Sequence, residues 1–516
     1  MKKYICLLAA NLLLLGTVSC TEELTQVPLS QGTEQNFYAT PGDFIQARNA
    51  VYSVAFHGTG TTAYGYANRV LNLSETRSDN LLALTTASRD WEGINSFYTS
   101  ISSNAYVKEA YVSNYNAIYK ANQLLEKITE KGDAIFTNPA DKASMAAEAR
   151  FLRAFCYFDL IRWFGRVPLI DRTMTAQEAS KIGRTPVVDI YNLIISDLQL
   201  AIPDLTTSTT DAAYVGRVTK YGAKALLGLV YMTRSSPNYG IDGAMLGLNE
   251  WDKAYQQLND IKTSGSFVFG TDYAAIFKTE GTANKENVLT IPYTQSLASS
   301  IGGNFMVEVG YEPYFASVGI GTAQGSLEGR PISTGFLNMF AANDNRKTVG
   351  IATSYTVASG TYKGSYTFPV YKKYIDPARY GTGGREDWGV DFMVIRYTDV
   401  LMLMAECTLH GGGGTQADVD AIVNQVRTRA GVPANALNIT LDQLFDERRK
   451  EFFSEGTRWF DLIRSGNALT IMNAWKAAED TGNKIRTIDK NGLLYPIPLS
   501  EMLAVPGLYD QNPGYD

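Results

Sequence analysis

The sequence predicts a mostly α-helical fold in which antiparallel helical hairpins stack into a solenoid interrupted by long insertions. Apolar residues recur at three- and four-residue spacing over long segments, which indicates amphipathic helices. Small residues stand beside large ones inside these segments, as Ala149 does beside Phe151 and Gly228 beside Tyr231. This alternation lets helices cross closely, as tetratricopeptide hairpins do, although no clean repeat of about 34 residues is present.

The helical segments follow one another along most of the chain. After an extended lead-in over 20–41, Pro41-Gly42-Asp43 opens a helix that reaches about Phe56. We expect the scaffold mainly in 42–57, 105–264 and 392–477. Its further helices are predicted near 106–128, 140–164, 186–202, 217–234, 249–263, 392–409, 416–430 and 441–463.

Two stretches of the chain, 58–104 and 265–391, show no sustained helical period and are rich in glycine, serine and threonine. Long irregular insertions on a rigid scaffold are where proteins build recognition surfaces. We therefore expect these loop-rich regions to form the ligand-binding part of a single domain over 42–516.

The N-terminus is typical of an exported, lipid-anchored protein. Lys2 and Lys3 precede an apolar run that is too short to span a bilayer, which predicts a signal peptide over 1–19. The small residues before Cys20 resemble a lipobox, in which Cys20 is lipidated; ordinary secretion with a chance cysteine is the alternative. The acidic pair Glu22-Glu23 resembles the surface-export signal of Bacteroidetes lipoproteins, which implies the outer face of the outer membrane.

The composition excludes several classes of function. Hydrophobic residues make up 45% of the chain and charged residues 19%, which suits a packed core. The net charge of −6 and the lack of a basic cluster argue against a nucleic-acid partner. The chain has only two histidines, too few for a His-rich metal site and few from which to build a Ser-His-Asp triad. We predict neither a metal nor a cofactor. Cys156 and Cys407 read as buried thiols.

A set of carboxylates near the C-terminus could be mistaken for a catalytic site. Glu447, Glu451 and Glu455 follow one another at four-residue steps among several arginines. A glycosidase needs two carboxyl groups that face one cleft, one of them with a raised pKa, whereas arginines keep carboxylates ionised. We therefore interpret this set as ion pairs between helices.

Three segments resemble hallmarks of the SusD/RagB family: 148–169 (EARFLRAFCYFDLIRWFGRVPL), 395–406 (IRYTDVLMLMAE) and 447–464 (ERRKEFFSEGTRWFDLIR). The shorter matches 423–431, 495–498 and 512–515 fall in the order that this family has. The resemblance implies four tetratricopeptide-like helix pairs with a variable ligand-binding part and no catalytic residues. It also implies capture of a nutrient, most often a glycan, for a SusC-like TonB-dependent outer-membrane barrel.

Sugars are recognised by a flat aromatic face and a few fixed polar groups. Our first candidates are therefore Trp91 as the stacking platform, with Arg89 and Asn95 bonding hydroxyl groups. The alternative for Trp91 is that it seals its loop onto the solenoid. Further candidate ligand residues come from the same two insertions: Tyr311, Tyr314, Phe315, Tyr64 and Tyr66.

Three functional hypotheses follow. The first is a surface glycan-binding lipoprotein that serves a transporter barrel. The second is a peptide-binding RagB-type member of the same family, whose loops grip extended backbone. The third and most remote is a secreted glycosidase.

Overall fold

The computed structural model describes residues 37–58, 65–83, 89–209, 211, 215–278, 284–295, 303–321, 329–381 and 387–515. The predicted signal peptide, Cys20 and Tyr64 lie outside the described residues. Within the described part of the chain, no helix combines the length and the apolar character that crossing a membrane requires.

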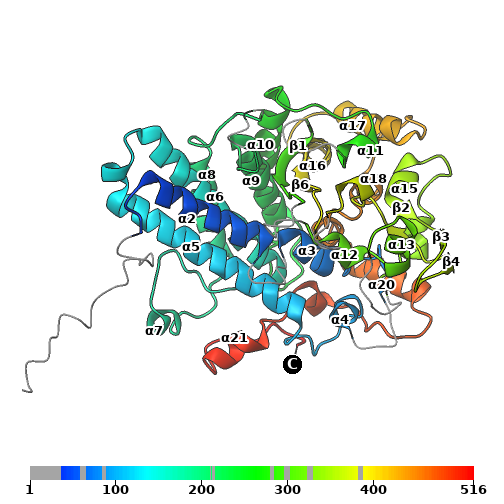
Figure 1. Cartoon of the computed structure of the whole chain (residues 1–516), viewed down its shortest axis with the longest axis horizontal. Helices are drawn as coiled ribbons and strands as arrows, with labels where there is room; N and C mark the ends of the chain where they lie inside the picture. Colours follow the sequence, from blue (N-terminus) through cyan, green and yellow to red (C-terminus); the bar gives the residue numbers. More distant parts are fainter. Residues whose placement is uncertain are drawn as a thin grey trace, which may run out of the picture.

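The scaffold is a chain of eight helices in which each helix packs against the next in sequence order. Figure 1 shows them crossing the molecule from α2 and α5 at one side to α17 at the other. This arrangement confirms the predicted mostly helical, tetratricopeptide-like fold. The eight helices are α2 (Pro41–Tyr52), α5 (Ala105–Ile135), α6 (Pro139–Phe164), α8 (Val187–Ala201), α9 (Lys220–Ser235), α10 (Trp251–Thr263), α16 (Tyr397–Leu409) and α17 (Gln416–Ala430).

The ends of the scaffold helices are set by local chemistry. Thr40 and Asp43 form a capping box that starts α2, and Asn104 caps α5 through its side-chain oxygen. Gly165 ends α6 at a φ of +68°, and a side chain there would meet the backbone oxygen of Asp242 at 2.1 Å. Only glycine therefore fits this turn.

Shorter elements fill the rest of the fold. The short helices are η2 (Ser53–His57), α3 (Tyr66–Val70), η3 (Leu71–Glu75), α4 (Asp90–Asn95), α7 (Ala176–Ala179), α11 (Tyr273–Ile276), α12 (Met306–Val309), α13 (Glu312–Ser317), α14 (Thr334–Leu337), α15 (Asn345–Gly350), η6 (Pro377–Arg379), α18 (Leu441–Phe452), α19 (Arg458–Arg464), α20 (Ala468–Glu479), η7 (Lys490–Leu493) and α21 (Leu499–Ala504).

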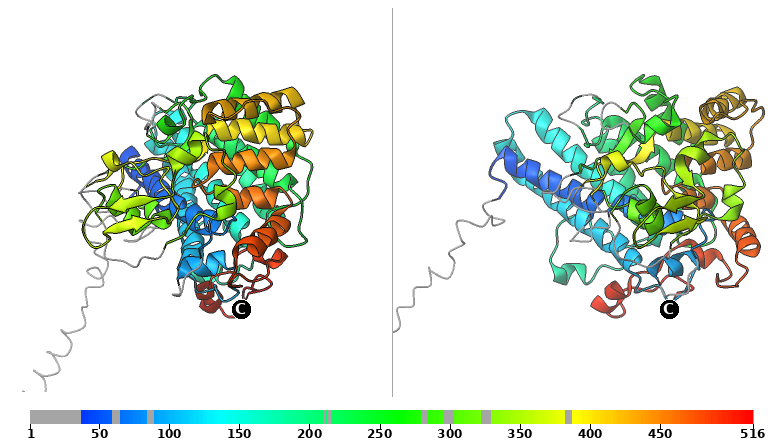
Figure 2. Two further views of the ribbon diagram at one scale, coloured as in Figure 1. Left: turned by 90° about the vertical axis from the view of Figure 1, so that its right-hand side faces the viewer. Right: turned by 45° about the vertical axis from the view of Figure 1, so that its right-hand side comes forward.

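The described residues contain three small antiparallel sheets, and Figure 2 shows short strands beside the helices. Their strands pair as β1 (Asn287–Ile291) with β6 (Phe392–Arg396), β2 (Ile351–Ala352) with β5 (Val370–Tyr371), and β3 (Tyr355–Val357) with β4 (Gly364–Tyr366). The predicted insertion 265–391 thus contains β1 to β5 and five short α-helices.

Three expectations about single elements need correction. The helix predicted over 392–409 begins with strand β6, because an apolar run of five residues suits a buried strand as well as a helix turn. The helix predicted over 441–463 is split into α18 and α19 by Ser454 and Gly456, both at positive φ. The region 58–104 is not a surface loop throughout, since α3 and η3 are buried along their whole length.

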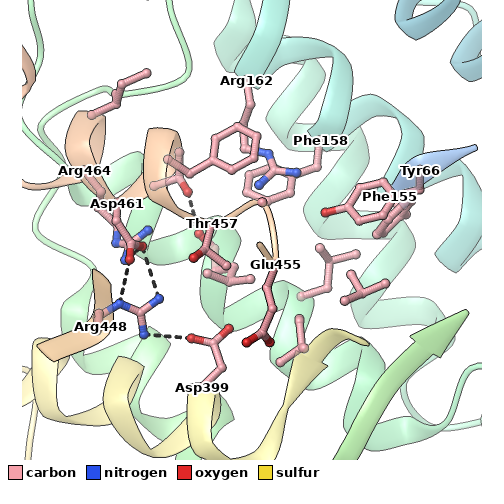
Figure 3. A pocket seen from close by; sticks show the side chains of 18 of the residues that line it. Tyr66, Phe155, Phe158, Arg162, Asp399, Arg448, Glu455, Thr457, Asp461 and Arg464 are labelled. Atoms are coloured by element: carbon pink, nitrogen blue, oxygen red, sulfur yellow. Dashed lines mark hydrogen bonds and ion pairs between the residues drawn. The ribbon is translucent and has the colours of Figure 1, made fainter. Parts of the chain in front are cut away.

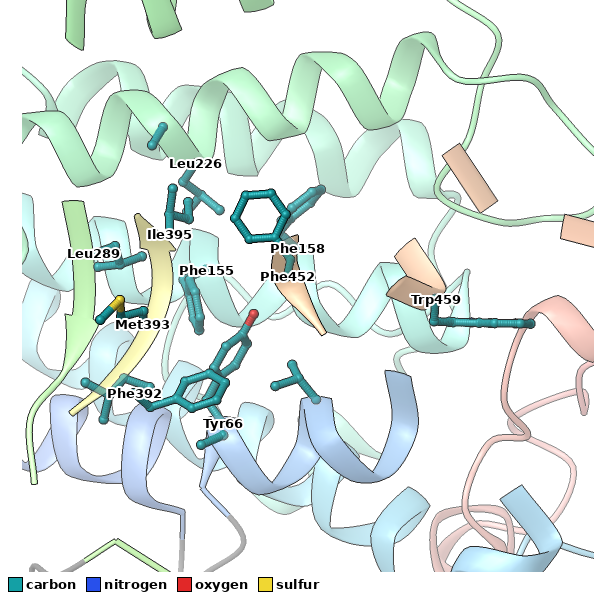
Figure 4. Close-up of a cluster of buried hydrophobic side chains, with 14 of the residues drawn as sticks. Tyr66, Phe155, Phe158, Leu226, Leu289, Phe392, Met393, Ile395, Phe452 and Trp459 are labelled. Atoms are coloured by element: carbon teal, nitrogen blue, oxygen red, sulfur yellow. The ribbon is translucent and has the colours of Figure 1, made fainter. Parts of the chain in front are cut away.

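The main hydrophobic core joins the scaffold to the insertions. In Figure 4, Tyr66 from α3 lies against Phe155 of α6 and Phe392 of β6, with ring centroids 5.0 and 6.4 Å apart. Trp163 and Trp459 are fully buried and pack in this core. Cys156 and Cys407 are buried free thiols, as expected.

Candidate functional site

The carboxylates of α18 form a closed set of ion pairs, which we name the α18 ion-pair network. It is centred on Glu451, whose Oε1 lies 2.8 Å from Arg396 Nη2 and 2.7 Å from Arg429 Nη2. Burial raises the pKa of the Glu451 carboxyl, but the surrounding arginines, led by Arg429 and Arg396, outweigh it and lower the pKa to about 2. Glu447 and Glu455 complete the network, pairing with Arg346 and Lys373 respectively. The predicted ion pairs are confirmed.

A cavity of about 60 Å³ lies between α6, α9, α16 and α19, and Tyr66 is one of the residues that line it. Figure 3 shows Arg448 at its wall, with hydrogen bonds to Asp399 at 2.7 Å and to Asp461 at 2.9 Å. Burial raises the pKa of Asp399 in spite of Arg448. Because ligand pockets usually measure about 300–1,000 Å³, this cavity suits a few waters and not a sugar ring.

A larger bowl of about 550 Å³ opens beside the C-terminal segment. Arg166 bridges it, with Nε 2.9 Å from Asp242 and Nη2 2.5 Å from Asp510. No aromatic side chain is among its described lining residues. It therefore lacks the flat apolar face on which a sugar ring stacks.

Trp91 is the only one of the six tryptophans that lies outside the hydrophobic core. The other five are 0–7% exposed and belong to the main core, whereas Trp91 on α4 is partly exposed and is not among the residues packed against it. Its indole Nε1 makes no hydrogen bond to a described residue. Trp91 thus presents an aromatic ring and an unused N–H group at the surface.

Arg330 lies over the Trp91 ring, with its guanidinium carbon 5.4 Å from the ring centroid. Its Nη1 donates to Asn72 Oδ1 at 2.6 Å and to Thr76 Oγ1 at 2.9 Å. Its Nη2 donates to Glu308 Oε2 at 3.2 Å and to the Tyr106 hydroxyl at 3.4 Å. Arg330 therefore fixes one side of Trp91.

The backbone around these residues is held by long-range pairing. Leu81 and Ile332 form an antiparallel bridge, and the N–H of Leu82 donates to the carbonyl of Pro331 at 2.9 Å. Asn95 ties α4 to the same segment, because its Oδ1 accepts from the Ala83 N–H and its Nδ2 donates to the Leu81 carbonyl. Trp91 and Arg330 are thus mounted on one small framework.

Two buried amide groups that bond to Glu308 and Arg330 each leave one of their polar atoms without a partner. Asn68 and Asn72 are each 1% exposed and stand four residues apart on α3 and η3. Asn68 Nδ2 donates to Glu308 Oε1 at 3.1 Å, but its Oδ1 has no partner, and neither does Asn72 Nδ2. A buried polar group without a partner is costly and is frequent at functional sites. We name Trp91, Arg330, Glu308, Asn68 and Asn72 the Trp91 platform.

The second predicted cluster adjoins this platform through Gly329. The ring of Tyr311 stacks on Phe368 at 4.2 Å, and a side chain at Gly329 would lie 2.9 Å from Tyr311 and 3.0 Å from Phe368. Tyr311 and Tyr314 are 6% and 7% exposed, yet their hydroxyls make no hydrogen bond to a described residue. Burial raises the pKa of Tyr314 to about 12, so this hydroxyl stays protonated.

Three of the predicted ligand residues are packed in the interior, so we exclude them from the candidate site. Every side-chain polar atom of Asn95 is bonded to backbone and the residue is fully buried, so it supports α4 instead of meeting a ligand. Phe315 is 1% exposed and belongs to the main core, as does Tyr66. Arg89 is exposed just before α4. The site that remains consists of Trp91 and Arg89. Tyr311 and Tyr314 adjoin it through Gly329, packed in a second and smaller hydrophobic cluster.

Sequence reasoning missed Arg330 and Glu308, which stand more than 200 residues from Trp91 in the chain. The only local signal is Gly329-Arg330-Pro331, which marks an irregular turn but names no partner. The contact of Arg330 with Trp91 joins two insertions, and such a long-range contact has no periodicity by which a single sequence could reveal it.

Comparisons with known proteins agree over most of the chain. The model described as "SusD family" matches residues 273–515, and the model described as "Starch-binding associating with outer membrane" matches residues 48–232. SusD-like protein P2 of Formosa agariphila is 28% identical over 555 aligned positions that cover 100% of both chains. The starch-binding protein SusD of Bacteroides thetaiotaomicron is 29% identical over 127 residues, 24% of this chain and 22% of its own.

A solved structure shows the same fold. Surface glycan-binding protein A from Bacteroides thetaiotaomicron, in complex with laminarihexaose, superposes with a TM-score of 0.76 at 20% identity. The match covers 92% of this chain and 100% of the other. Together with the two family models and the full-length relative, the helical scaffold and its ion pairs lead to one assignment: the chain belongs to the SusD/RagB family.

Proposed function

We propose that this protein is a cell-surface glycan-binding lipoprotein that captures an oligosaccharide or polysaccharide at the Trp91 platform. It then delivers the glycan to a SusC-like TonB-dependent transporter in the outer membrane. The observation that carries the proposal is the position of Trp91, which alone among the tryptophans stands outside the core.

The chemistry of the platform suits a sugar. A pyranose presents C–H groups on its faces and hydroxyls around its edge, so it needs an aromatic face with donors and acceptors beside it. Trp91 supplies the face and its own N–H, and the Tyr311 hydroxyl can act as donor or acceptor. Asn68 and Asn72 keep an unpaired acceptor and an unpaired donor buried beside Glu308 and Arg330. Arg330 holds the ring in place before a ligand arrives, which reduces the entropic cost of binding.

The relatives support the same class of ligand. One family model is described as starch-binding, and the structural relative with a TM-score of 0.76 was solved with a glucan oligosaccharide bound. We extend glycan binding from these proteins to this chain because the fold is shared and because a surface tryptophan is present.

We propose binding without turnover. The acidic residues that could imitate a hydrolase pair, Glu447, Glu451 and Glu455, are each ion-paired in the α18 network. The lowered pKa of Glu451 keeps its carboxyl ionised near neutral pH, so Glu451 is not suited to act as a general acid.

Calorimetric titration of the purified full-length protein in detergent tests the ligand class. We expect saturable binding to at least one of soluble starch, laminarin and xylan, without release of reducing ends over many hours. Binding of a protein digest with no binding of any polysaccharide would contradict the proposal and favour the peptide hypothesis.

The anchor and the partner are tested separately. We expect Cys20→Ala to move the protein out of the outer-membrane fraction, since stable anchoring depends on acyl chains buried in the bilayer. Purification of the wild type from cross-linked outer membranes should recover a TonB-dependent barrel in stoichiometric amount. A wild type that stays in the periplasm, or that recovers no barrel, would overturn this part of the proposal.

A further inference from the structure

We infer that the Trp91 platform selects neutral glycans over glycans that carry carboxylate or sulfate groups, and that Glu308 sets this preference by neutralising the charge of Arg330. The inference rests on the proposed function and names the substrate class of the same site.

The guanidinium of Arg330 has no bidentate edge left for an anion. Its two terminal nitrogens carry four N–H groups, and these meet four acceptors: Asn72, Thr76, Glu308 and Tyr106. An arginine grips a carboxylate or sulfate through two parallel N–H groups, one of which must be on a terminal nitrogen. A ligand anion would therefore have to displace an acceptor that is already in place.

The positive charge of Arg330 is also neutralised where it stands. Glu308 lies 3.2 Å away, and the side chains of Arg330 and Glu308 are only 5% and 11% exposed. The second oxygen of Glu308 accepts from Asn68 Nδ2, so the carboxylate is held from both sides. An anion placed above Trp91 would be repelled by Glu308 as much as it is attracted by Arg330, so the ion pair offers it no net attraction.

The groups that the platform leaves unpaired are all neutral. They are the indole N–H of Trp91, Asn68 Oδ1, Asn72 Nδ2 and the hydroxyl of Tyr311. At the exposed start of α4, the charge of Arg89 is followed at once by that of Asp90, so this rim adds no net positive charge. Glu308 and Arg330 act here as positioning and specificity residues.

The test compares affinities of the full-length protein for neutral and acidic polysaccharides by calorimetry. The neutral probes are soluble starch, laminarin and xylan, and the acidic probes are polygalacturonate and carrageenan. We expect the wild type to bind a neutral probe at least about tenfold more tightly than either acidic probe. In Glu308→Gln, which keeps the shape but removes the charge, the ratio of acidic to neutral affinity should rise by about tenfold or more.

Glu130→Gln is the matched control. It makes the same change of net charge on the exposed end of α5, about 36 Å along the helix from Tyr106. We expect its ratio of acidic to neutral affinity to equal that of the wild type. An equal rise in both variants would overturn the role of Glu308.

The wild type keeps the inference testable if Glu308→Gln does not fold. Its affinity for the neutral probe should change by less than about twofold between about 0.05 and 0.5 M sodium chloride, because no net charge takes part. Tight binding of an acidic probe that is lost in Trp91→Ala would overturn the selectivity while leaving glycan capture intact. Binding of no polysaccharide at all would overturn glycan capture and the selectivity with it.

Discussion

Two clusters of arginines and carboxylates lie in this protein, one around Glu451 and one around Glu308. In the α18 ion-pair network, Glu451 is fully buried and contacts several arginines, and Arg396 in turn is shared among three glutamates. At the Trp91 platform, a single ion pair lies beside an exposed aromatic ring and two half-used amides.

The difference separates scaffold from site. The richer cluster contains the family's most recognisable motif, yet all of its charges are used to join α16, α17 and α18 to strand β6. The sparser cluster leaves groups that a ligand can use. A dense charged motif is thus a sign of structure here, whereas we propose that the lone tryptophan outside the core marks the functional site.

The largest expected effect is on the scaffold side. In Glu451→Ala, the arginines at positions 346, 396 and 429 lose a shared buried partner, so we expect a loss of about 3–5 kcal/mol in the free energy of unfolding. Urea denaturation measures it. Glu130→Ala, which breaks an exposed pair with Lys127, should cost no more than about 1 kcal/mol. Equal losses in the two variants would remove the distinction between the buried network and a surface pair.

Acid should destabilise the fold through its buried, ion-paired carboxylates. Asp79 pairs with Arg449 of α18 and Arg458 of α19, and so extends the α18 ion-pair network. Burial raises and the neighbouring arginines lower the pKa values of Glu451 and Asp79, and the result is about 2 for both, against ordinary values of 4.5 and 3.8. The unfolded chain therefore takes up these protons first as the pH falls. The stability they provide is complete above about pH 4.5 and is lost as the pH falls towards 2, on the order of 1.4 kcal/mol for each unit of pKa difference.

Urea midpoints measured at about pH 7, 5, 4 and 3 check this sign. The midpoint should fall steeply below about pH 4.5. A midpoint that is constant or rises on acidification would show that the carboxylates of the network are not ionised in the folded protein.

On the platform side, Trp91→Ala should remove binding without unfolding the protein. Tryptophans at binding centres contribute about 2 kcal/mol or more, which corresponds to a loss of roughly thirtyfold in glycan affinity. The melting temperature should stay within about 2 °C, because Trp91 is not packed in the main core. Calorimetric titration beside Tyr119→Ala, an aromatic residue that is 50% exposed elsewhere on α5, is the comparison. Equal effects on affinity would dismiss Trp91 as the stacking residue.

The smallest expected effect distinguishes two tyrosine hydroxyls. Tyr311→Phe keeps the stacked ring but removes a hydroxyl without a protein partner, so affinity should fall about two- to tenfold while stability is unchanged. Tyr157→Phe is the mirror control, because the Tyr157 hydroxyl bonds the backbone of Ile170. It should lower the unfolding free energy by about 1 kcal/mol and leave affinity unchanged. The reverse pattern would place Tyr311 in the scaffold.

The helical periodicity predicted the eight scaffold helices because each runs for 12 to 31 residues, which is long enough for the period to repeat. It failed where a local signal was ambiguous: the residues of β6 run without a break into α16, and the sequence of α18 continues apolar through Ser454. The composition of the insertions led us to propose Trp91 as a ligand residue. The same reasoning chose Asn95, whose amide instead bonds to the backbone carbonyls of Thr76 and Leu81, which the spacing of residues in the sequence does not reveal.

The partners of Trp91 could not be predicted for a related reason. Arg330 and Glu308 reach it only through the folded arrangement of two insertions, and the Gly329 that makes room for Tyr311 and Phe368 is one glycine among 45. Local sequence patterns therefore identify the type of residue that a binding site needs, whereas long-range contacts in the fold decide which residue of that type lies in the site.

The most direct test of the central claim is a crystal structure of the protein with the best-binding oligosaccharide from the calorimetric panel. The account predicts a sugar ring stacked on Trp91, with its hydroxyls within hydrogen-bond distance of the indole N–H and the neighbouring amide or phenol groups. An oligosaccharide bound elsewhere, with Trp91 and Arg330 unchanged and unoccupied, would contradict it.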